Sequence, residues 1–181
     1  MKQRAFEVCL ALIETEGWKG FSFAKAAEVS GIPLSVFHEH FLNPIDVMTH
    51  LFRRIDENVL KGLPLEDGDT PKDKLFEIFM ARFDAAQPYK RVLQQFWKEW
   101  LPSAAPLACQ GVTSMGWMME AAGLSQQGLP GMLRAQGLTI LYFLTLKTWL
   151  SDDSPDLGKT MAFLDKGLTQ LEGMAAFLGR L

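Results

Sequence analysis

The sequence predicts an all-α protein in which a three-helix, helix-turn-helix unit is followed by a larger helical bundle. Apolar residues recur at spacings of three and four along almost the whole chain, which is the period of amphipathic helices. No stretch of any length shows the alternation that is typical of a strand. Gly31 separates two short helical segments, where the tight turn of a helix-turn-helix falls.

Residues that cap helix ends divide the first half of the chain into helices. An apolar face over residues 6–13 marks a first helix that ends near Gly17. Ser22 is suited to cap a second, short helix over residues 23–29, and a third covers residues 34–41. The Asn43, Pro44 and Asp46 pattern then starts a longer helix. Residues 62–70 have the composition of a linker, so we expect domains at 1–61 and 70–181.

Helix-starting residues and apolar runs also divide the second half of the chain into helices. Thr70 and Pro71 start a helix, Pro88 opens the next, and residues 107–122 form a Met- and Trp-bearing helix. Residues 128–131 are expected to be a loop. Residues 133–150 are apolar nearly all round, which predicts a buried central helix. Residues 152–156 break the chain before the last helix; a simple capping role for Ser154 and Pro155 is one explanation of this segment.

Composition limits the function classes. The chain has 181 residues, of which 48% are hydrophobic and 22% charged, so it is globular and long enough for a sizeable core. The formal net charge of -3 argues against a protein built mainly to bind phosphates. Two cysteines without a CxxC motif indicate a reducing compartment. With no signal peptide or spanning segment in the sequence, a cytoplasmic location is expected.

Three segments carry a resemblance to the TetR family, namely residues 17–22, 26–32 and 34–41, and the resemblance covers Ala5 to about Leu60. It implies a TetR-like fold, a homodimer, and DNA contacts from the second and third helices. If the protein is a regulator, the residues expected to contact DNA are Lys25, Ser35, Val36, His38 and His40.

The charge of this region is unfavourable for DNA. Residues 1–61 carry seven basic and eight acidic residues, and Lys25 is the only Lys or Arg between Ser22 and Phe41. DNA affinity depends on neutralised phosphates, and Glu39 adds repulsion. The sequence therefore predicts weak, sequence-indifferent DNA binding. It leaves open whether the three-helix unit is a structural cap or a working DNA reader.

The bundle is rich in Phe, Trp and Met, which can line a deformable apolar pocket or form ordinary core. The predicted ligand-binding residues are Phe79, Phe83, Phe96, Trp97, Trp100, Met115, Met118 and Phe143. The expected ligand is an apolar small molecule or an isoprenoid lipid.

A second resemblance covers about Leu75 to Leu171. It rests on Trp117, residues 121–123, Arg134, Tyr142, Thr145, residues 153–156, Thr160, Phe163 and Leu164. These are similar to the lipid-binding accessory proteins of ubiquinone biosynthesis, the ninth of the Coq series. The resemblance implies a TetR-like fold that binds isoprenoid quinone intermediates and assists a quinone-pathway enzyme. Membrane contact by the last turns stays open.

A heptad stripe on the last helix predicts the dimer seam: Leu157, Met161, Leu164, Leu168 and Leu171. We find no catalytic motif, and the His38 and His40 side chains are too differently directed to chelate one metal, so no enzyme activity, cofactor or metal is expected. Two functions remain: a lipid-binding accessory protein of ubiquinone biosynthesis, and a ligand-responsive transcriptional repressor.

Overall fold

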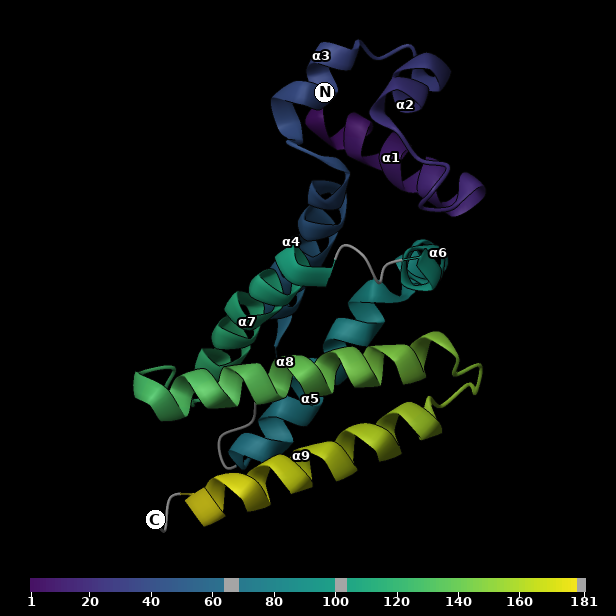
Figure 1. Ribbon diagram of the computed structural model, residues 1–181. Coiled ribbons are helices and arrows are strands. Elements are labelled where there is room, and N and C mark those ends of the chain that lie inside the picture. The colour runs from purple at the N-terminus through teal and green to yellow at the C-terminus, as the bar shows by residue number, and fades with distance from the viewer. Residues whose placement is uncertain (64–68, 100–103, 179–181) are drawn as a thin grey trace. The chain divides into compact units, whose positions relative to one another are not determined.

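The computed structural model describes residues 1–63, 69–99 and 104–178, and these ranges contain helices and loops but no strand. The first four helices are α1 (Lys2–Glu16), α2 (Phe23–Ser30), α3 (Leu34–His40) and α4 (Pro44–Gly62). The remaining ones are α5 (Pro71–Ala86), the short 3-10 helix η1 (Gln87–Tyr89), α6 (Lys90–Glu99), α7 (Ala104–Ala121), α8 (Gly128–Leu150) and α9 (Gly158–Leu178). The prediction of an all-α fold is confirmed (Figure 1).

The chain forms two compact units. Unit 1 comprises Met1–Arg54 and Pro88–Leu107, and unit 2 comprises Ile55–Gln87 and Ala108–Leu181. Helix α4 contributes its first residues to unit 1 and its last residues to unit 2. The predicted division at residues 62–69 would place α6 in the second domain, whereas its contacts group it with the N-terminal helices.

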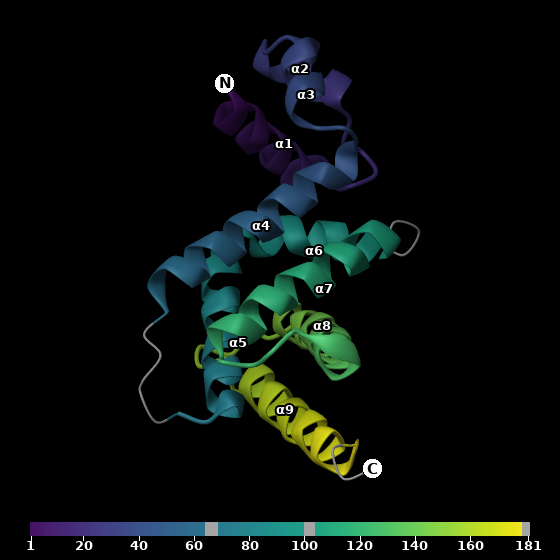
Figure 2. The ribbon, with the colours of Figure 1, turned by 90° about the vertical axis from the view of Figure 1, so that its left-hand side faces the viewer.

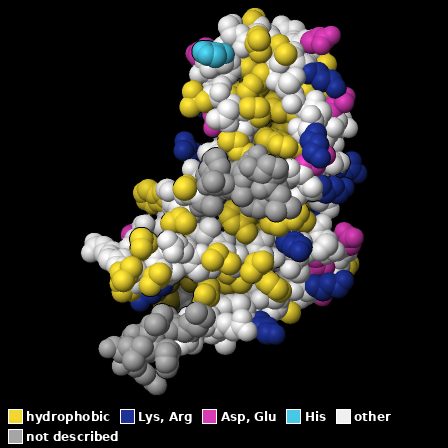
Figure 3. All heavy atoms as spheres, in the orientation of Figure 1, with side chains coloured by type: hydrophobic (Ala, Val, Ile, Leu, Met, Phe, Trp, Pro, Cys, Tyr) yellow, Lys and Arg dark blue, Asp and Glu magenta, His cyan; other side chains and the backbone are white. Residues whose placement is uncertain are grey.

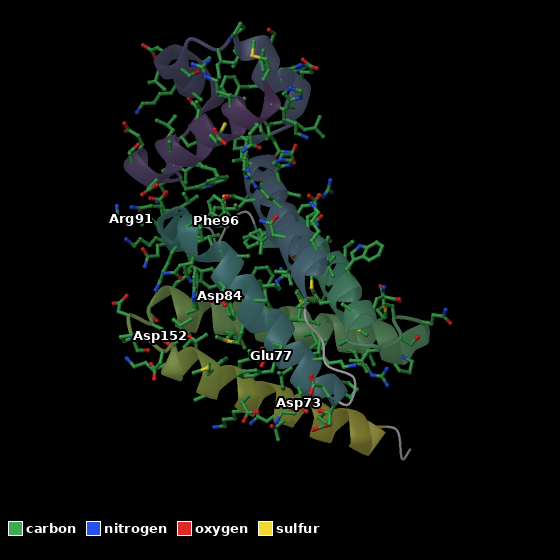
Figure 4. All side chains as sticks on the ribbon, turned by 180° about the vertical axis from the view of Figure 1, so that it is seen from behind. Asp73, Glu77, Asp84, Arg91, Phe96 and Asp152 are labelled. Carbon is green, nitrogen blue, oxygen red and sulfur yellow. The ribbon has the colours of Figure 1, made fainter. Side chains whose placement is uncertain are left out.

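Aromatic packing explains why α6 belongs to unit 1. The Phe96 ring lies edge-on to Trp18, with 4.8 Å between the ring centroids. The Glu99 carboxylate accepts a hydrogen bond of 2.6 Å from the backbone N–H of Lys19, in the turn after α1. Figure 4 shows Phe96 and Arg91 on this helix. A helix distant in sequence therefore completes the core of the N-terminal unit.

The predicted helix starts are confirmed at two caps. The Ser22 hydroxyl accepts a 3.2 Å hydrogen bond from the Lys25 N–H at the start of α2. Thr70 and Asp73 form a capping box at the start of α5, where each side chain accepts a hydrogen bond from the other residue's backbone. Pro71 follows the cap, where its missing N–H costs nothing.

In unit 2, α8 and α9 run side by side in opposite directions, and both contact α5 (Figures 1 and 2). Gly167 of α9 faces Leu141 of α8 so closely that a Cβ at Gly167 would overlap the leucine side chain. Leu164 and Leu168 on the same helix are buried. The glycine thus lets the two longest helices of the unit pack closely.

Two predictions about this region were wrong. Helix α8 begins at Gly128, so residues 128–131 are not a loop; Pro130 lies in the first turn, where its N–H would have no intrahelical partner. The helix is also not buried all round. Leu133, Ile140 and Leu144 are 48%, 62% and 50% exposed, because only one face of α8 packs within the chain.

Candidate DNA-binding and ligand-binding sites

The turn between α2 and α3 has the geometry of a helix-turn-helix. Gly31 adopts a φ of 68°, a left-handed conformation that glycine adopts without steric cost. Phe37 is fully buried on the inner face of α3. The Phe23 ring stacks on Phe41 with a centroid distance of 5.8 Å, which holds the end of α3 against the start of α2. The aromatic residues therefore fix which face of α3 points outward.

The outward face carries the predicted DNA-contacting residues. Ser35 and His38 are exposed, and Val36 and His40 are partly exposed, so their side chains are accessible. Glu39 is exposed on the same short helix. The face offers hydroxyl and imidazole groups for base edges but adds a negative charge where a phosphate would approach.

The Lys25 side chain already forms an ion pair within the chain. Its ammonium group lies 2.8 Å from the Glu16 carboxylate, in an ion pair whose side chains are 38% and 44% exposed. An exposed pair of this kind contributes at most about 1 kcal/mol, so a phosphate can displace the glutamate.

The start of α4 is partly engaged by side chains. The Ile45 N–H, in its first turn, donates to the Asn43 side chain at 3.0 Å, and Asp46 accepts a 2.7 Å hydrogen bond from the Leu42 N–H, which precedes the helix. Helix N-termini bind phosphates through their free N–H groups. Because the Ile45 N–H is bonded and the Asp46 carboxylate is anionic, this helix start is poorly suited to a phosphate.

The predicted ligand-binding residues are divided between the units. Phe79, Phe83, Met115 and Met118 are buried in unit 2, where Phe143 is partly exposed. Phe96 is buried in unit 1 and Trp97 is partly exposed there. Trp100 lies outside the described residues. The structure therefore brings the α5, α7 and α8 members into one unit, and a ligand contact by any of the eight stays a prediction.

Two rings of this set belong to an aromatic stack. Phe83 lies nearly parallel to Tyr142, at 5.5 Å and 7°, and also stacks on Trp149 at 5.6 Å. Phe79 meets Tyr142 edge-on at 5.6 Å. Offset and edge-on geometries are the favourable ones for aromatic rings.

A buried polar cluster borders the stack. The Arg82 guanidinium lies 2.8 Å from the Asp56 carboxylate and donates a 2.7 Å hydrogen bond to the Ser114 hydroxyl. Its central carbon is 4.3 Å from the centroid of the Tyr142 ring. Burial raises the pKa of the Tyr142 hydroxyl, and the charge of Arg82 partly offsets that shift. Asp56, Arg82, Ser114 and Tyr142, which come from four different helices, are hereafter called the arginine cluster.

Sequence reasoning missed Arg82, although a signal was present. The three acidic residues Asp73, Glu77 and Asp84 are exposed along α5 (Figure 4). Arg82, in contrast, stands between apolar positions, three residues after Phe79 and next to Phe83, and only 2% of it is exposed. A charge within an apolar helix stripe indicates a buried partner.

The loop between α8 and α9 explains the motif of the second resemblance. One Asp152 carboxylate oxygen accepts hydrogen bonds from the Thr160 N–H and hydroxyl, at 2.9 and 2.7 Å, and the other accepts from Ser154. Figure 4 labels Asp152 in this loop. These hydrogen bonds, first those of the Ser154 and Thr160 side chains, hold the pKa of Asp152 well below its usual range.

Ser154 and Pro155 do not cap the last helix, which was the alternative explanation of this motif. Residues 154–157 form a turn, closed by the Leu157 N–H donating to the Ser154 carbonyl, and α9 begins at Gly158. The Ser154 N–H and hydroxyl both donate to Asp152, which holds the residue in the loop before the helix. The polar residues of the motif thus have a structural role in joining α8 to α9.

The stripe predicted as a dimer seam does not lie on one surface. Leu164 and Leu168 are 0% and 3% exposed, so they pack within their own chain and are covered before any partner arrives. Leu157, Met161 and Leu171 are partly exposed. The exposed apolar residues of the two helices are instead Leu129, Met132, Leu133, Ile140 and Leu144 of α8 and Phe163 of α9. Figure 3 shows hydrophobic side chains gathered along α8.

The part of the chain that the structure describes shows no metal site and no membrane-spanning helix, and one of its two cysteines is buried. It contains no group of three or more His, Cys, Asp or Glu side chains arranged to hold a metal ion. None of its helices is both long and apolar enough to cross a membrane. Cys9 is buried, and burial raises the pKa of its thiol to about 12, which makes the thiolate inaccessible at neutral pH.

Comparison with solved structures establishes the fold as TetR-like. The chain is similar to a TetR transcriptional regulator from Nitrosomonas europaea, with a TM-score of 0.72 and 20% sequence identity over 98% of both chains. It is also similar to a TetR transcriptional regulator from a Rhodococcus species, with a TM-score of 0.63 and 14% identity over 93% of both chains. No family model matches the sequence. No curated protein matches it either, and the predicted role in ubiquinone biosynthesis has no support among the matches.

Proposed function

We propose that this protein is a ligand-responsive, TetR-type transcriptional regulator that binds DNA through α2 and α3. The observation that carries the proposal is the outward face of α3, held by Phe37 and by the left-handed turn at Gly31. A TetR-like fold over nearly the whole chain supports it, because the likeness includes both units.

The charge pattern sets the expected mode of DNA binding. Sequence-independent attraction is weak, because Glu39 is exposed on α3, Lys25 is paired with Glu16, and the first turn of α4 carries Asp46 and an Ile45 N–H that is already bonded to Asn43. Affinity for an operator then depends on base contacts by residues such as Ser35 and His38, and on two copies binding together.

The test is selection of bound duplexes from a random library, followed by anisotropy titration of the enriched sequence across salt concentrations. Glu39→Lys is expected to make the slope of log affinity against log salt more negative by about 0.9, the value of one added phosphate contact. The matched control is Glu57→Lys, which makes the same charge change at an exposed position of unit 2. Failure to enrich any sequence, together with equal slopes for both variants, would contradict DNA reading by α3.

The partner in this proposal is a second copy of the chain, bound through the exposed face of α8. Ile140 and Leu144 lie one turn apart, and Phe163 of α9 is 39% exposed. An apolar stripe of this length is unusual on a monomer.

Ile140→Asp combined with Leu144→Asp is expected to yield a monomer in sedimentation velocity. Leu60→Asp, at a partly exposed leucine of α4, is the control that leaves the dimer intact. A wild-type protein that is monomeric at micromolar concentration would remove the dimer from the proposal.

A further inference from the structure

The arginine cluster contains hydrogen-bond donors that the protein leaves unused. Within the described residues, the Arg82 Nε–H and the Tyr142 O–H are buried and donate to no protein acceptor. Both residues are only 2% exposed. Buried donors without an acceptor lower stability, and native proteins contain few of them. Because two such donors lie on residues that contact each other, we expect their acceptor to belong to another molecule.

The charge of the cluster indicates what that acceptor is. Arg82 already has a carboxylate partner in Asp56, at 2.8 Å, so the pair is neutral as a whole. A carboxylate ligand would place a second negative charge beside Asp56 in a poorly solvated region. A carbonyl oxygen accepts the same hydrogen bonds without that cost. The cluster therefore favours a neutral acceptor.

The aromatic side chains around the cluster indicate the rest of the ligand. The Tyr142 ring lies between Phe79 and Phe83, and Phe83 continues the stack to Trp149. Such side chains offer flat apolar surface and preferred stacking geometries. A planar, largely apolar ring next to the carbonyl would extend the stack.

We propose that unit 2 binds a neutral aromatic ketone or a closely related conjugated carbonyl compound, whose oxygen accepts hydrogen bonds from Tyr142 Oη and Arg82 Nε. The inference rests on the proposed regulator function, and names the class of its ligand. It requires the rings of the stack, which come from α5 and α8, to separate or slide when the ligand enters.

The test uses three probes that share one ring system: acetonaphthone, ethylnaphthalene and naphthoate. Affinities come from quenching of tryptophan fluorescence and from isothermal calorimetry. The wild-type protein is expected to bind the ketone about ten- to thirtyfold more tightly than the hydrocarbon, which corresponds to two net hydrogen bonds. Naphthoate is expected to bind no more tightly than the ketone.

Tyr142→Phe isolates the hydroxyl, because it keeps the ring in the stack. It is expected to reduce the preference for ketone over hydrocarbon to the part that the Arg82 Nε–H supplies. Without ligand its melting temperature is expected to stay close to that of the wild type, since the hydroxyl donates to no protein acceptor. Tyr89→Phe, the same change at the chain's other tyrosine, is the control that alters neither quantity.

Four results would overturn the ligand class: equal affinity for ketone and hydrocarbon, no binding of either, tightest binding of naphthoate, or a clear loss of stability in Tyr142→Phe. The last would mean that a bound water already satisfies the hydroxyl. DNA binding is measured on the same preparations. A protein that binds a selected duplex but fails these tests retains the proposed function and loses only the ligand class.

Discussion

Replacing Arg82 by methionine is expected to lower the free energy of unfolding by about 3–5 kcal/mol, the usual cost of removing one partner of a buried ion pair. The side chains of Arg82 and Asp56 are 2% and 11% exposed, and their closest atoms are 2.8 Å apart. At an effective dielectric constant of about 20, that distance corresponds to a Coulomb attraction of about 6 kcal/mol, part of which desolvation offsets.

The loss has further components, because Arg82 also donates to Ser114 and lies over the Tyr142 ring. Methionine keeps most of the volume, so cavity formation adds little. For a chain of this length, about 4 kcal/mol corresponds to a melting-temperature decrease of about 8–16 °C. The assay is urea denaturation followed by circular dichroism, with thermal melting as the second measurement.

Arg91→Met is the matched control. The Arg91 guanidinium lies 3.6 Å from the Glu14 carboxylate, and its side chain is 84% exposed, so we expect a change below about 1 kcal/mol. The double variant with Arg82→Met and Asp56→Leu removes both charges and is expected to recover most of the loss. Equal effects of Arg82→Met and Arg91→Met, or simple addition of the costs in the double variant, would refute the reasoning.

Three more predictions concern single positions. Hydrogen bonds from Ser154 and Thr160 lower the pKa of Asp152, so its stabilising contribution is present above a pH of about 4 and is lost as the pH falls further. Asp152→Asn should therefore show a shallower decline of stability below pH 4 than the wild type in acid titrations. Leu164→Ala should cost about 2–5 kcal/mol in urea denaturation, because the side chain is fully buried; a cost below 1 kcal/mol would contradict its place in the core. Gly31→Ala, at a φ of 68°, should cost about 1 kcal/mol and weaken DNA binding more than it changes helix content.

The helices and their starts could be predicted from the sequence because local rules determine them. Ser22, Thr70 and Asp73 cap helices through bonds to residues three positions away, and the pattern is visible in the chain. Gly31 could be identified for the same reason. These features depend on neighbours in sequence, so no tertiary information is needed.

The arginine cluster could not be assembled in this way. Asp56, Arg82, Ser114 and Tyr142 are separated by 26 to 32 positions from one to the next in the sequence, and they meet only because four helices converge. Phe79 and Phe83 could be recognised as apolar, but the sequence does not distinguish ordinary core from a binding wall. In the structure, the buried N–H of Arg82 Nε and the Tyr142 O–H donate to no protein acceptor, and this favours a ligand at the arginine cluster.

The exposed face of helix α8 could not be predicted from the sequence either. Its nearly continuous apolar sequence predicted burial on every side, but Tyr142, Trp149 and Leu146 pack within the chain while Ile140 and Leu144 remain exposed. A surface that binds a second chain needs the same residue types as a core, because both exclude water from apolar area. Periodicity therefore cannot assign a face to its own chain or to a partner. Since Leu164 and Leu168 are already covered within the chain, the exposed face of α8 is the surface that we propose for a two-fold contact, and Ile140 is the residue with which to test it.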